Sequence, residues 1–202
     1  SRNEEKLNEV HKIISDRGGH SQVIVTNVAN ESDIENLYSK IDTDRVDILV
    51  NNAGFGVFNK IQKISSKEWD EQMNTNLRGS FLMTRYLVES MISRKTGKLV
   101  FINSVAGINA YPYSSAYVAS KYGLRGFASS LREELREYNI KVISIHPGAV
   151  DTPFWDNLKM DFPREEMLNP ELLAESIVHA IQMPGNLTVE ELVVRRAAGD
   201  FN

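Results

Sequence analysis

The stretch VDILVNNAG, residues 46–54, decides the fold class of this chain. Its apolar residues follow one another almost without interruption, and the run ends in asparagine, alanine and glycine. A strand of a parallel sheet is covered on both faces, so it consists of such a continuous apolar run and does not alternate. Polar and small residues after it are typical of a strand end that a ligand approaches along the backbone. We therefore expect a strand here that is buried on both faces, with a ligand near its carboxyl end.

Strand and helix patterns alternate along the rest of the chain. Short apolar runs predict further strands at 21–28, 98–104, 140–148 and 190–196. Apolar residues at helical spacing predict helices over 66–92 and 115–138. Capping residues predict three helix starts, at Asn30, Ser65 and Asn169. Because parallel strands are joined by crossover helices, this order predicts a Rossmann-like, doubly wound α/β sheet in three layers, with residues 1–202 in a single domain.

The composition narrows the possible partners. The 202 residues are 42% hydrophobic and 25% charged, as in a globular protein with a sizeable core. A net charge of −4 argues against a nucleic-acid surface, and no apolar run is long enough for a membrane span. The chain has no cysteine and its four histidines are scattered, so we expect neither disulfides nor a metal site. The residues shown contain no signal peptide, and we expect a cytoplasmic protein.

The segment SSAYVASKYGLRGF, residues 114–127, places Tyr117 and Lys121 four residues apart. Residues at this spacing share one face of a helix, so the two side chains can stand side by side. A phenol has a pKa of about 10 and is a poor acid or base near neutrality, but a neighbouring ammonium group lowers that pKa. Taken alone, the pair also fits two surface residues of an ordinary helix.

Four further segments decide between these interpretations. Three of them lie where strands are expected to end, namely NNAG (51–54), NSVAG (103–107) and HPGAVDTP (146–153). The fourth, NTNLRG (74–79), lies within a predicted helix. Together with Tyr117 and Lys121, in this order and spacing, they resemble the short-chain dehydrogenase/reductase family in its compact, single-domain form. The resemblance covers essentially the whole chain.

The resemblance implies four catalytic residues. Tyr117 would be the proton donor and acceptor, and Lys121 would lower its pKa and hold the ribose of a nicotinamide cofactor. Ser104 would donate a hydrogen bond to the substrate oxygen, and Asn76 would hold a water molecule that links Lys121 to solvent. Because the hydride comes from the cofactor, the implied reaction is the reversible reduction of a ketone or aldehyde of a small molecule to an alcohol.

The resemblance also implies the cofactor contacts. These are Arg2, Asn27, Val28, Asn51, Ala53, Gly54, Tyr117, Lys121, Pro147, Gly148, Val150 and Thr152. Asn27 and Val28 stand where the family usually has Asp-Val against adenine, and an Asn carbonyl oxygen can still accept from the adenine amino group. Arg2 stands near the place where NAD-preferring members carry an acid. An arginine there favours the 2′-phosphate, hence NADP(H) over NAD(H), although it also fits the solvated start of a helix.

One part of the family pattern is missing from these residues. The family's glycine-rich fingerprint, which places the pyrophosphate at a helix N-terminus, does not occur in them. Gly18 and Gly19 follow a helical pattern and do not open one. We therefore expect the first strand–helix–strand unit to be absent from the given chain, and the parent protein to be longer, with that segment cut, deleted or left out.

The substrate is less well defined than the chemistry. The segment FWDNLKMDFPREEMLNP (154–170) suggests a small pocket with aromatic walls and no fixed charge, together with Phe55, Val105, Tyr111, Tyr113 and Trp155. The segments PGAVDTPFW and VEELVVRRAAGDF are similar to those of bacterial members that resemble sepiapterin reductase and 3-oxoacyl-carrier-protein reductase. This likeness is an analogy within the family and does not derive a substrate.

Two other hypotheses about the function of the chain stay open. A cofactor-sensing or structural domain could keep the fold without the chemistry, although intact Ser104, Tyr117 and Lys121 argue against it. Extended relatives that act on nucleotide sugars share the Tyr–Lys pair, but they need a larger carboxyl-terminal domain than the residues after Tyr117 provide. The helices expected over 66–92 and 115–138 resemble those through which family members assemble, so we expect a homodimer or homotetramer.

Overall fold

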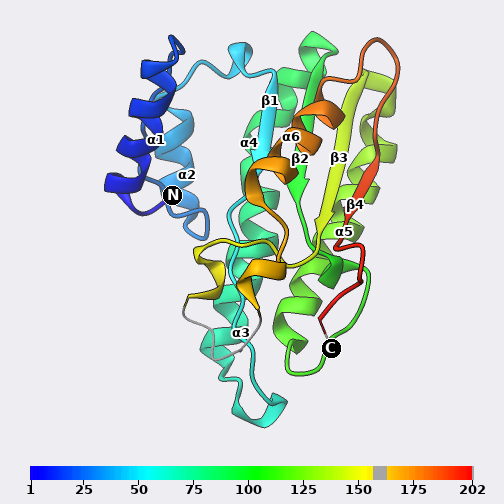
Figure 1. Ribbon diagram of the computed structural model, residues 1–202. Helices are drawn as coiled ribbons and strands as arrows, with labels where there is room; N and C mark the ends of the chain where they lie inside the picture. Colours follow the sequence, from blue (N-terminus) through cyan, green and yellow to red (C-terminus); the bar gives the residue numbers. More distant parts are fainter. Residues whose placement is uncertain (157–162, 202) are drawn as a thin grey trace.

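The computed structural model describes residues 1–156 and 163–201 and has a parallel sheet at its centre (Figure 1). The four strands are β1 (Ile48–Asn51), β2 (Gly97–Ile102), β3 (Ile140–Pro147) and β4 (Glu191–Val194). They lie side by side in chain order, with Leu49 opposite Leu99 and Leu99 opposite Val142. Because all four strands run in the same direction, their carboxyl ends meet at one edge of the sheet.

Helices cover both faces of this sheet. The helices of the described residues are α1 (Glu4–Asp16), α2 (Glu31–Tyr38), α3 (Ser66–Met73), the π-helical turn η3 (Asn74–Arg78), α4 (Gly79–Arg94), α5 (Ser115–Leu135) and α6 (Pro170–Ile181). Of these, α1 and α2 lie beside the sheet, past its β1 edge (Figure 1). Short 3-10 turns are η1 (Thr43–Arg45), η2 (Ile61–Lys63), η4 (Val105–Gly107), η5 (Arg136–Tyr138), η6 (Pro153–Trp155) and η7 (Arg164–Glu166). In Figure 1, α4 and α5 lie behind the sheet and α6 lies in front of it.

The core is divided by the alternation of side chains along the strands. Leu99 and Phe101 of β2 pack in one cluster with buried residues of α4 and α5. Val100, between them, belongs to a second cluster that also contains Ile177 and Ile181 of α6. Successive residues of a strand point to opposite faces, so one strand supplies both clusters. The predicted doubly wound α/β sheet is confirmed.

The predicted helix starts are also confirmed. Each of the three helices begins with a side chain that accepts a backbone N–H of its first turn. These side chains are Asn30 for α2, Ser65 for α3 and Asn169 for α6. At Ser65 the side chain of Glu68 accepts the Ser65 backbone N–H in return, which completes a capping box. These caps satisfy N–H groups that have no partner within the helix, which explains why each helix begins where it does.

The helix predicted over 66–92 is interrupted. The π-helical turn Asn74–Arg78 separates α3 from α4. A π-helical turn inserts extra backbone into a helix and often occurs at functional sites. Here it contains Asn76, whose side chain is fully buried.

The strand predicted at 21–28 is wrong. Residues 21–27 belong to no strand, and in the described part of the chain the sheet contains only β1 to β4. A strand is defined by a ladder of backbone hydrogen bonds, and an apolar run cannot form one without a neighbour. Thr26 instead donates its backbone N–H to the Ser1 carbonyl oxygen, at 3.0 Å.

The expectation that residues 46–54 form a strand buried on both faces is wrong as well. The strand β1 has four residues, and Ile48 and Val50 are 42% and 47% exposed. Within residues 1–156 and 163–201, β1 pairs only with β2 and so forms an edge of the sheet.

No helix in these two ranges is long and apolar enough to cross a membrane.

Candidate active site

Two cavities lie beyond the carboxyl ends of the strands. The larger cavity has a volume of about 720 Å³ and is lined by residues that follow β1, β2 and β3 and by one face of α5. The smaller cavity, about 500 Å³, is lined by residues 1–2, the stretch 24–28, the end of β1 and the start of α4. Asn52 and Gly54 line both cavities, so the two meet just after β1.

The residues predicted for the site divide between the two cavities. The larger cavity is lined by Gly54, Ser104, Tyr117, Lys121, Pro147, Gly148, Val150 and Thr152. The smaller cavity is lined by Arg2, Asn27, Val28, Asn51, Ala53 and Gly54. Asn76 alone among the predicted residues lines neither. The structure therefore brings the predicted set together at one edge of the sheet, in two adjoining groups.

The helix α5 positions Tyr117 and Lys121 one turn apart. The Nζ atom of Lys121 lies 5.7 Å from the centroid of the Tyr117 ring. Lys121 is only 4% exposed, and its ammonium group donates to the carbonyl oxygen of Ile102 at 3.0 Å, where β2 ends. A buried cation is retained only where such a partner compensates for lost hydration. The lysine is therefore a fixed part of the cavity wall and does not extend into solvent.

Ser104 follows β2 and faces the same cavity. Its hydroxyl oxygen accepts the backbone N–H of Ala106 at 3.1 Å, which opens the turn η4. The backbone carbonyl oxygen of Ser104 lies 3.2 Å from Nδ1 of His146. His146 is completely buried in β3, and burial lowers its pKa. A neutral, enclosed imidazole supports the backbone at Ser104 and has no access to a substrate.

Burial controls the charge of the Tyr–Lys pair. It raises the pKa of Tyr117 to about 12, against the opposing effect of the hydrogen bond to the Ser104 side chain. It lowers the pKa of Lys121 to about 8. Burial is the largest effect on the pKa of Tyr117 in this structure, and the expectation that Lys121 lowers this pKa stays a prediction. At neutral pH the phenol is fully protonated, which is the form that can donate a proton.

Asn76 lies behind the junction of the cavities. Its Oδ1 atom accepts the backbone N–H of Phe55 at 3.0 Å. Its Nδ2 atom donates to the Phe55 carbonyl oxygen at 2.9 Å and to Oγ of Ser120 at 3.0 Å. These contacts fix the chain just after Gly54. A Cβ atom at Gly54 would lie 3.2 Å from Asn76 Oδ1 and 3.6 Å from Lys121 Nζ, so glycine leaves room for a ligand beside the ammonium group.

The smaller cavity contains the residues predicted to contact adenosine. Oδ1 of Asn27, the oxygen predicted for adenine, accepts the backbone N–H of Ala29 at 3.2 Å, and a carbonyl oxygen has a second lone pair. Val28 packs tightly on the start of α4, where a Cβ atom at Gly79 would lie 2.9 Å from Cγ2 of Val28. Arg2 is exposed at the cavity wall, directly before α1. The residues present thus fit an elongated nucleotide whose two ends occupy the two cavities.

Aromatic rings line the larger cavity. The Phe58 ring lies 5.4 Å from the ring of Tyr117, 6.2 Å from that of Phe154 and 6.5 Å from that of Trp155. Phe154 belongs to the predicted substrate segment, whereas the sequence did not identify Phe58, because nothing in its spacing distinguishes a cavity wall from a core position. Among the residues predicted for the substrate pocket, Val105, Tyr111, Tyr113 and Trp155 line this cavity. The prediction that Phe55 lines the substrate pocket is wrong, since Phe55 lines the smaller cavity.

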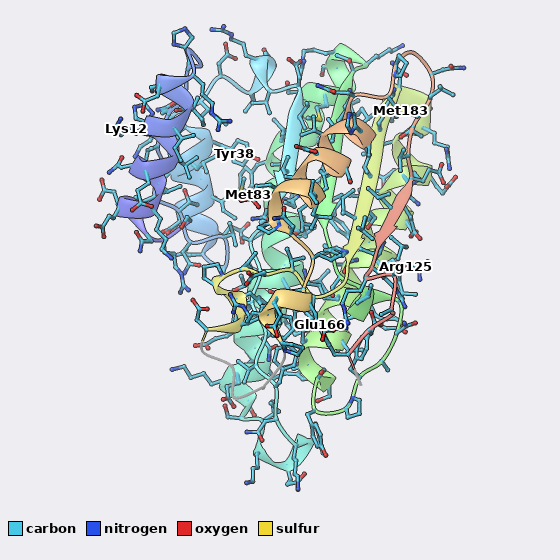
Figure 2. The ribbon with its side chains drawn as sticks, viewed as in Figure 1. Lys12, Tyr38, Met83, Arg125, Glu166 and Met183 are labelled. Carbon is cyan, nitrogen blue, oxygen red and sulfur yellow. The ribbon has the colours of Figure 1, made fainter. Side chains whose placement is uncertain are left out.

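The acidic and basic side chains at the outer wall of the larger cavity neutralise one another. Arg196 pairs with Glu166 of η7, which Figure 2 labels near the carboxyl ends of the strands. Asp200 accepts a hydrogen bond from the Tyr111 hydroxyl and pairs with Arg195 at 3.4 Å. Residues 157–162 of the predicted substrate segment lie outside the described residues. In the described part of the chain, no group of three or more acidic or histidine side chains could hold a metal ion.

Comparisons with known proteins agree with this geometry. The family model for short chain dehydrogenases matches residues 1–162. A sepiapterin reductase of Chlorobaculum tepidum is 34% identical over 186 residues, which are 91% of this chain and 76% of that protein. A cyclopentanol dehydrogenase of Comamonas sp. is 34% identical over 178 residues, 86% of this chain and 71% of that protein. A metagenomic short-chain oxidoreductase crystallised with NADP superposes with a TM-score of 0.84 at 28% identity, covering 98% of this chain and 83% of that one.

Proposed function

The chain belongs to the short-chain dehydrogenase family of oxidoreductases, and from this premise we propose that it uses NADP(H) to reduce the carbonyl group of a small, uncharged molecule to an alcohol. One observation carries the proposal. A protonated phenol, Tyr117, lies in the same cavity as the Ser104 hydroxyl and the Lys121 ammonium group, where a second cavity begins. This combination suits the donation of a proton to an oxygen that gains negative charge.

The nicotinamide cofactor, when bound, supplies the hydride for this chemistry. Pro147, Gly148 and Thr152 would hold its nicotinamide half, and the residues of the smaller cavity, Gly54 included, its adenosine half. Their position on both sides of the cavity junction supports this assignment.

The chain's own residues handle the proton. Ser104 donates a hydrogen bond to the substrate oxygen and orients it toward Tyr117. As the carbonyl oxygen gains charge, the Tyr117 O–H bond breaks and a new O–H bond forms on the substrate, which becomes the alcohol. The Lys121 ammonium group stabilises the phenolate that remains. A proton from solvent then restores the phenol, and the reverse sequence oxidises an alcohol.

The preference for NADP(H) rests on Arg2. A guanidinium group at the wall of the smaller cavity can bind a phosphate in a bidentate manner, which the 2′-hydroxyl of NAD cannot exploit. The relative crystallised with NADP supports the same choice by analogy within the family. The paired charges and aromatic walls of the larger cavity favour a substrate that has no charge of its own, since an unpaired ion would lose hydration there.

The test combines binding and turnover. We expect saturable binding of NADPH, followed by fluorescence, and consumption of NADPH with a ketone or aldehyde. The Tyr117→Phe variant should bind NADPH normally and lose turnover by a factor of about 10² to 10⁴, as for removal of a general acid. Unchanged turnover in this variant would refute the proposal. Binding of NADPH with no turnover in either protein would instead support a cofactor-sensing domain.

We also propose that copies of the chain assemble through α4 and α5. Phe81 of α4 and Tyr122 of α5 are 40% and 44% exposed, and large exposed aromatic groups are enriched at protein interfaces. A dimer or tetramer would cover them. Sedimentation of the purified protein would identify the assembly.

A further inference from the structure

The loop over residues 55–59 is held at three points. Phe55 exchanges two hydrogen bonds with the Asn76 side chain. The backbone N–H of Asn59 donates to the carbonyl oxygen of Tyr113 at 2.8 Å. Between these two anchors, the backbone N–H of Val57 donates to Oε1 of Gln72 at 2.9 Å. The middle of the loop is thus held by a side chain that no motif in the sequence singles out.

Gln72 is suited to hold this backbone in place. It lies on α3 one turn before Asn76, and its side chain is fully buried. Its Nε2 atom donates to the carbonyl oxygen of Glu68 at 3.1 Å, which orients Oε1 toward the loop. A buried amide is costly unless both of its ends are hydrogen-bonded, and here both are. An apolar residue would be expected at such a position if packing were its only role.

The loop carries one wall of the larger cavity. Phe58 directly follows Val57, and its ring packs edge-on against Tyr117, at an interplanar angle of 63°. The space beside it is tight, because a Cβ atom at Gly56 would lie 2.8 Å from the Phe58 ring and 3.1 Å from that of Phe154. Displacement of the Val57 backbone would therefore move the Phe58 ring relative to Tyr117.

We propose that Gln72 is a positioning residue for the substrate pocket. Its amide fixes the backbone at Val57, and through it the Phe58 ring that a substrate contacts beside Tyr117. This inference rests on the proposed function of the larger cavity. It assigns to Gln72 the discrimination between ring-shaped carbonyl compounds, which can pack on Phe58, and small open-chain ones, which cannot.

The first arm of the test does not depend on turnover. Hydrogen–deuterium exchange of residues 55–58 is measured in the wild type and in Gln72→Met, which is similar in size but accepts hydrogen bonds only weakly. We expect exchange in Gln72→Met to be at least about tenfold faster, as when a hydrogen bond that closes a loop is lost. Gln182→Met, the same change at an exposed position after α6, should leave exchange in this loop unchanged. Unchanged exchange in Gln72→Met would overturn the proposal.

The second arm measures steady-state reduction of acetophenone and of 2-butanone with NADPH. In Gln72→Met the KM for acetophenone should rise about tenfold, with kcat within about twofold, because substrate binding changes and proton transfer does not. The KM for 2-butanone should change less than about twofold. Gln72→Glu retains an oxygen acceptor and should restore part of the acetophenone KM, most fully at acid pH where the buried carboxyl is neutral.

A double-mutant cycle separates this role from general destabilisation. If Gln72 acts through Phe58, Gln72→Met should raise the KM for acetophenone no further when Phe58→Ala is already present. Additive effects in the cycle, or equal KM changes for both ketones, would overturn the proposal. If the wild type reduces neither ketone while the exchange result holds, reduction of these two ketones fails as a function, but the positioning of the loop by Gln72 stands.

Discussion

The two adjoining cavities differ in how their walls are held in place. The larger cavity is fixed by buried side chains, such as that of Lys121, that bond directly to the backbone at strand ends. The smaller cavity is lined in part by residues 1–2 and 24–28, which meet in the backbone hydrogen bond from Thr26 to Ser1. The chemical step needs precise placement of the reacting groups, which the buried contacts of the larger cavity provide. Changes in the larger cavity should therefore alter turnover, and changes in the smaller one should alter cofactor affinity.

Removal of the buried cation should have the largest effect. In Lys121→Met we expect turnover with NADPH and a ketone to fall by a factor of about 10² to 10⁴, because the phenolate loses its stabilising charge. Steady-state kinetics at saturating NADPH measure this loss. The matched control, Lys67→Met on the exposed surface of α3, should keep wild-type turnover. Retained turnover in Lys121→Met would break the comparison, since the larger cavity would not then be the reactive one.

The same lysine should give the protein a distinctive pH dependence of stability. Its pKa is lowered from 10.5 to about 8, so between these values the unfolded chain binds more protons than the folded one. The free energy of unfolding should therefore rise with pH across this interval, by up to about 3 kcal/mol. Urea unfolding of wild type and Lys121→Met at several pH values isolates this contribution, because the variant lacks it. An equal pH dependence in both proteins would show that the ammonium group is solvated.

The raised pKa of Tyr117 acts in the opposite direction at higher pH. A phenol that titrates at about 12 when folded and near 10 when unfolded contributes stability below pH 10. That contribution is lost as pH rises toward 12. In Tyr117→Phe the loss of stability between pH 10 and 12, measured by urea unfolding, should therefore be smaller than in the wild type.

Local signals in the sequence predicted much of the fold. The capping residues Asn30, Ser65 and Asn169 act within one helical turn, and all three predictions are confirmed. The absence of a strand at 21–28 could not be predicted in the same way, because a ladder depends on a neighbour elsewhere in the chain. An apolar run indicates only that its residues favour burial, and it does not indicate which strand they would pair with.

The candidate site shows the same limit. Ser104, Tyr117 and Lys121 line one cavity. Ser104 follows a strand and the other two lie on one face of α5, and the apolar run and the four-residue spacing in the sequence predict these two placements. Gln72 and Phe58 could not be selected, since their roles come from contacts between α3 and a loop. The raised pKa of Tyr117 also depends on burial, which the spacing of two residues does not contain.

The smaller cavity should respond through affinity. In Arg2→Gln we expect the dissociation constant for NADPH to rise about tenfold, as for one lost charge-assisted hydrogen bond at an exposed site, and that for NADH to stay unchanged. Fluorescence titration with each cofactor measures both constants. Arg17→Gln, at the exposed end of α1, is the control. A loss of kcat at saturating NADPH in Arg2→Gln would contradict the proposed division between the cavities.

The smallest effect should come from the contact that joins α2 to α4. The Tyr38 hydroxyl donates to the Met83 carbonyl oxygen at 2.6 Å, and Figure 2 shows both residues at this junction. In Tyr38→Phe the ring and its stacking on Tyr86 remain, so the free energy of unfolding should fall by about 1 kcal/mol, as for one buried hydrogen bond. Chemical denaturation measures the change.

Tyr86→Phe is the matched control, because its hydroxyl bonds to Glu35 at the surface and should contribute less. Met83 lines the smaller cavity, so loosening this contact should weaken NADPH binding a few-fold, in proportion to the displacement of α2. The value of kcat at saturating NADPH should not change, because no group of the larger cavity moves. If kcat fell together with affinity, the two cavities would be coupled through α4, and the division between a reactive cavity and a cofactor-binding cavity would have to be abandoned.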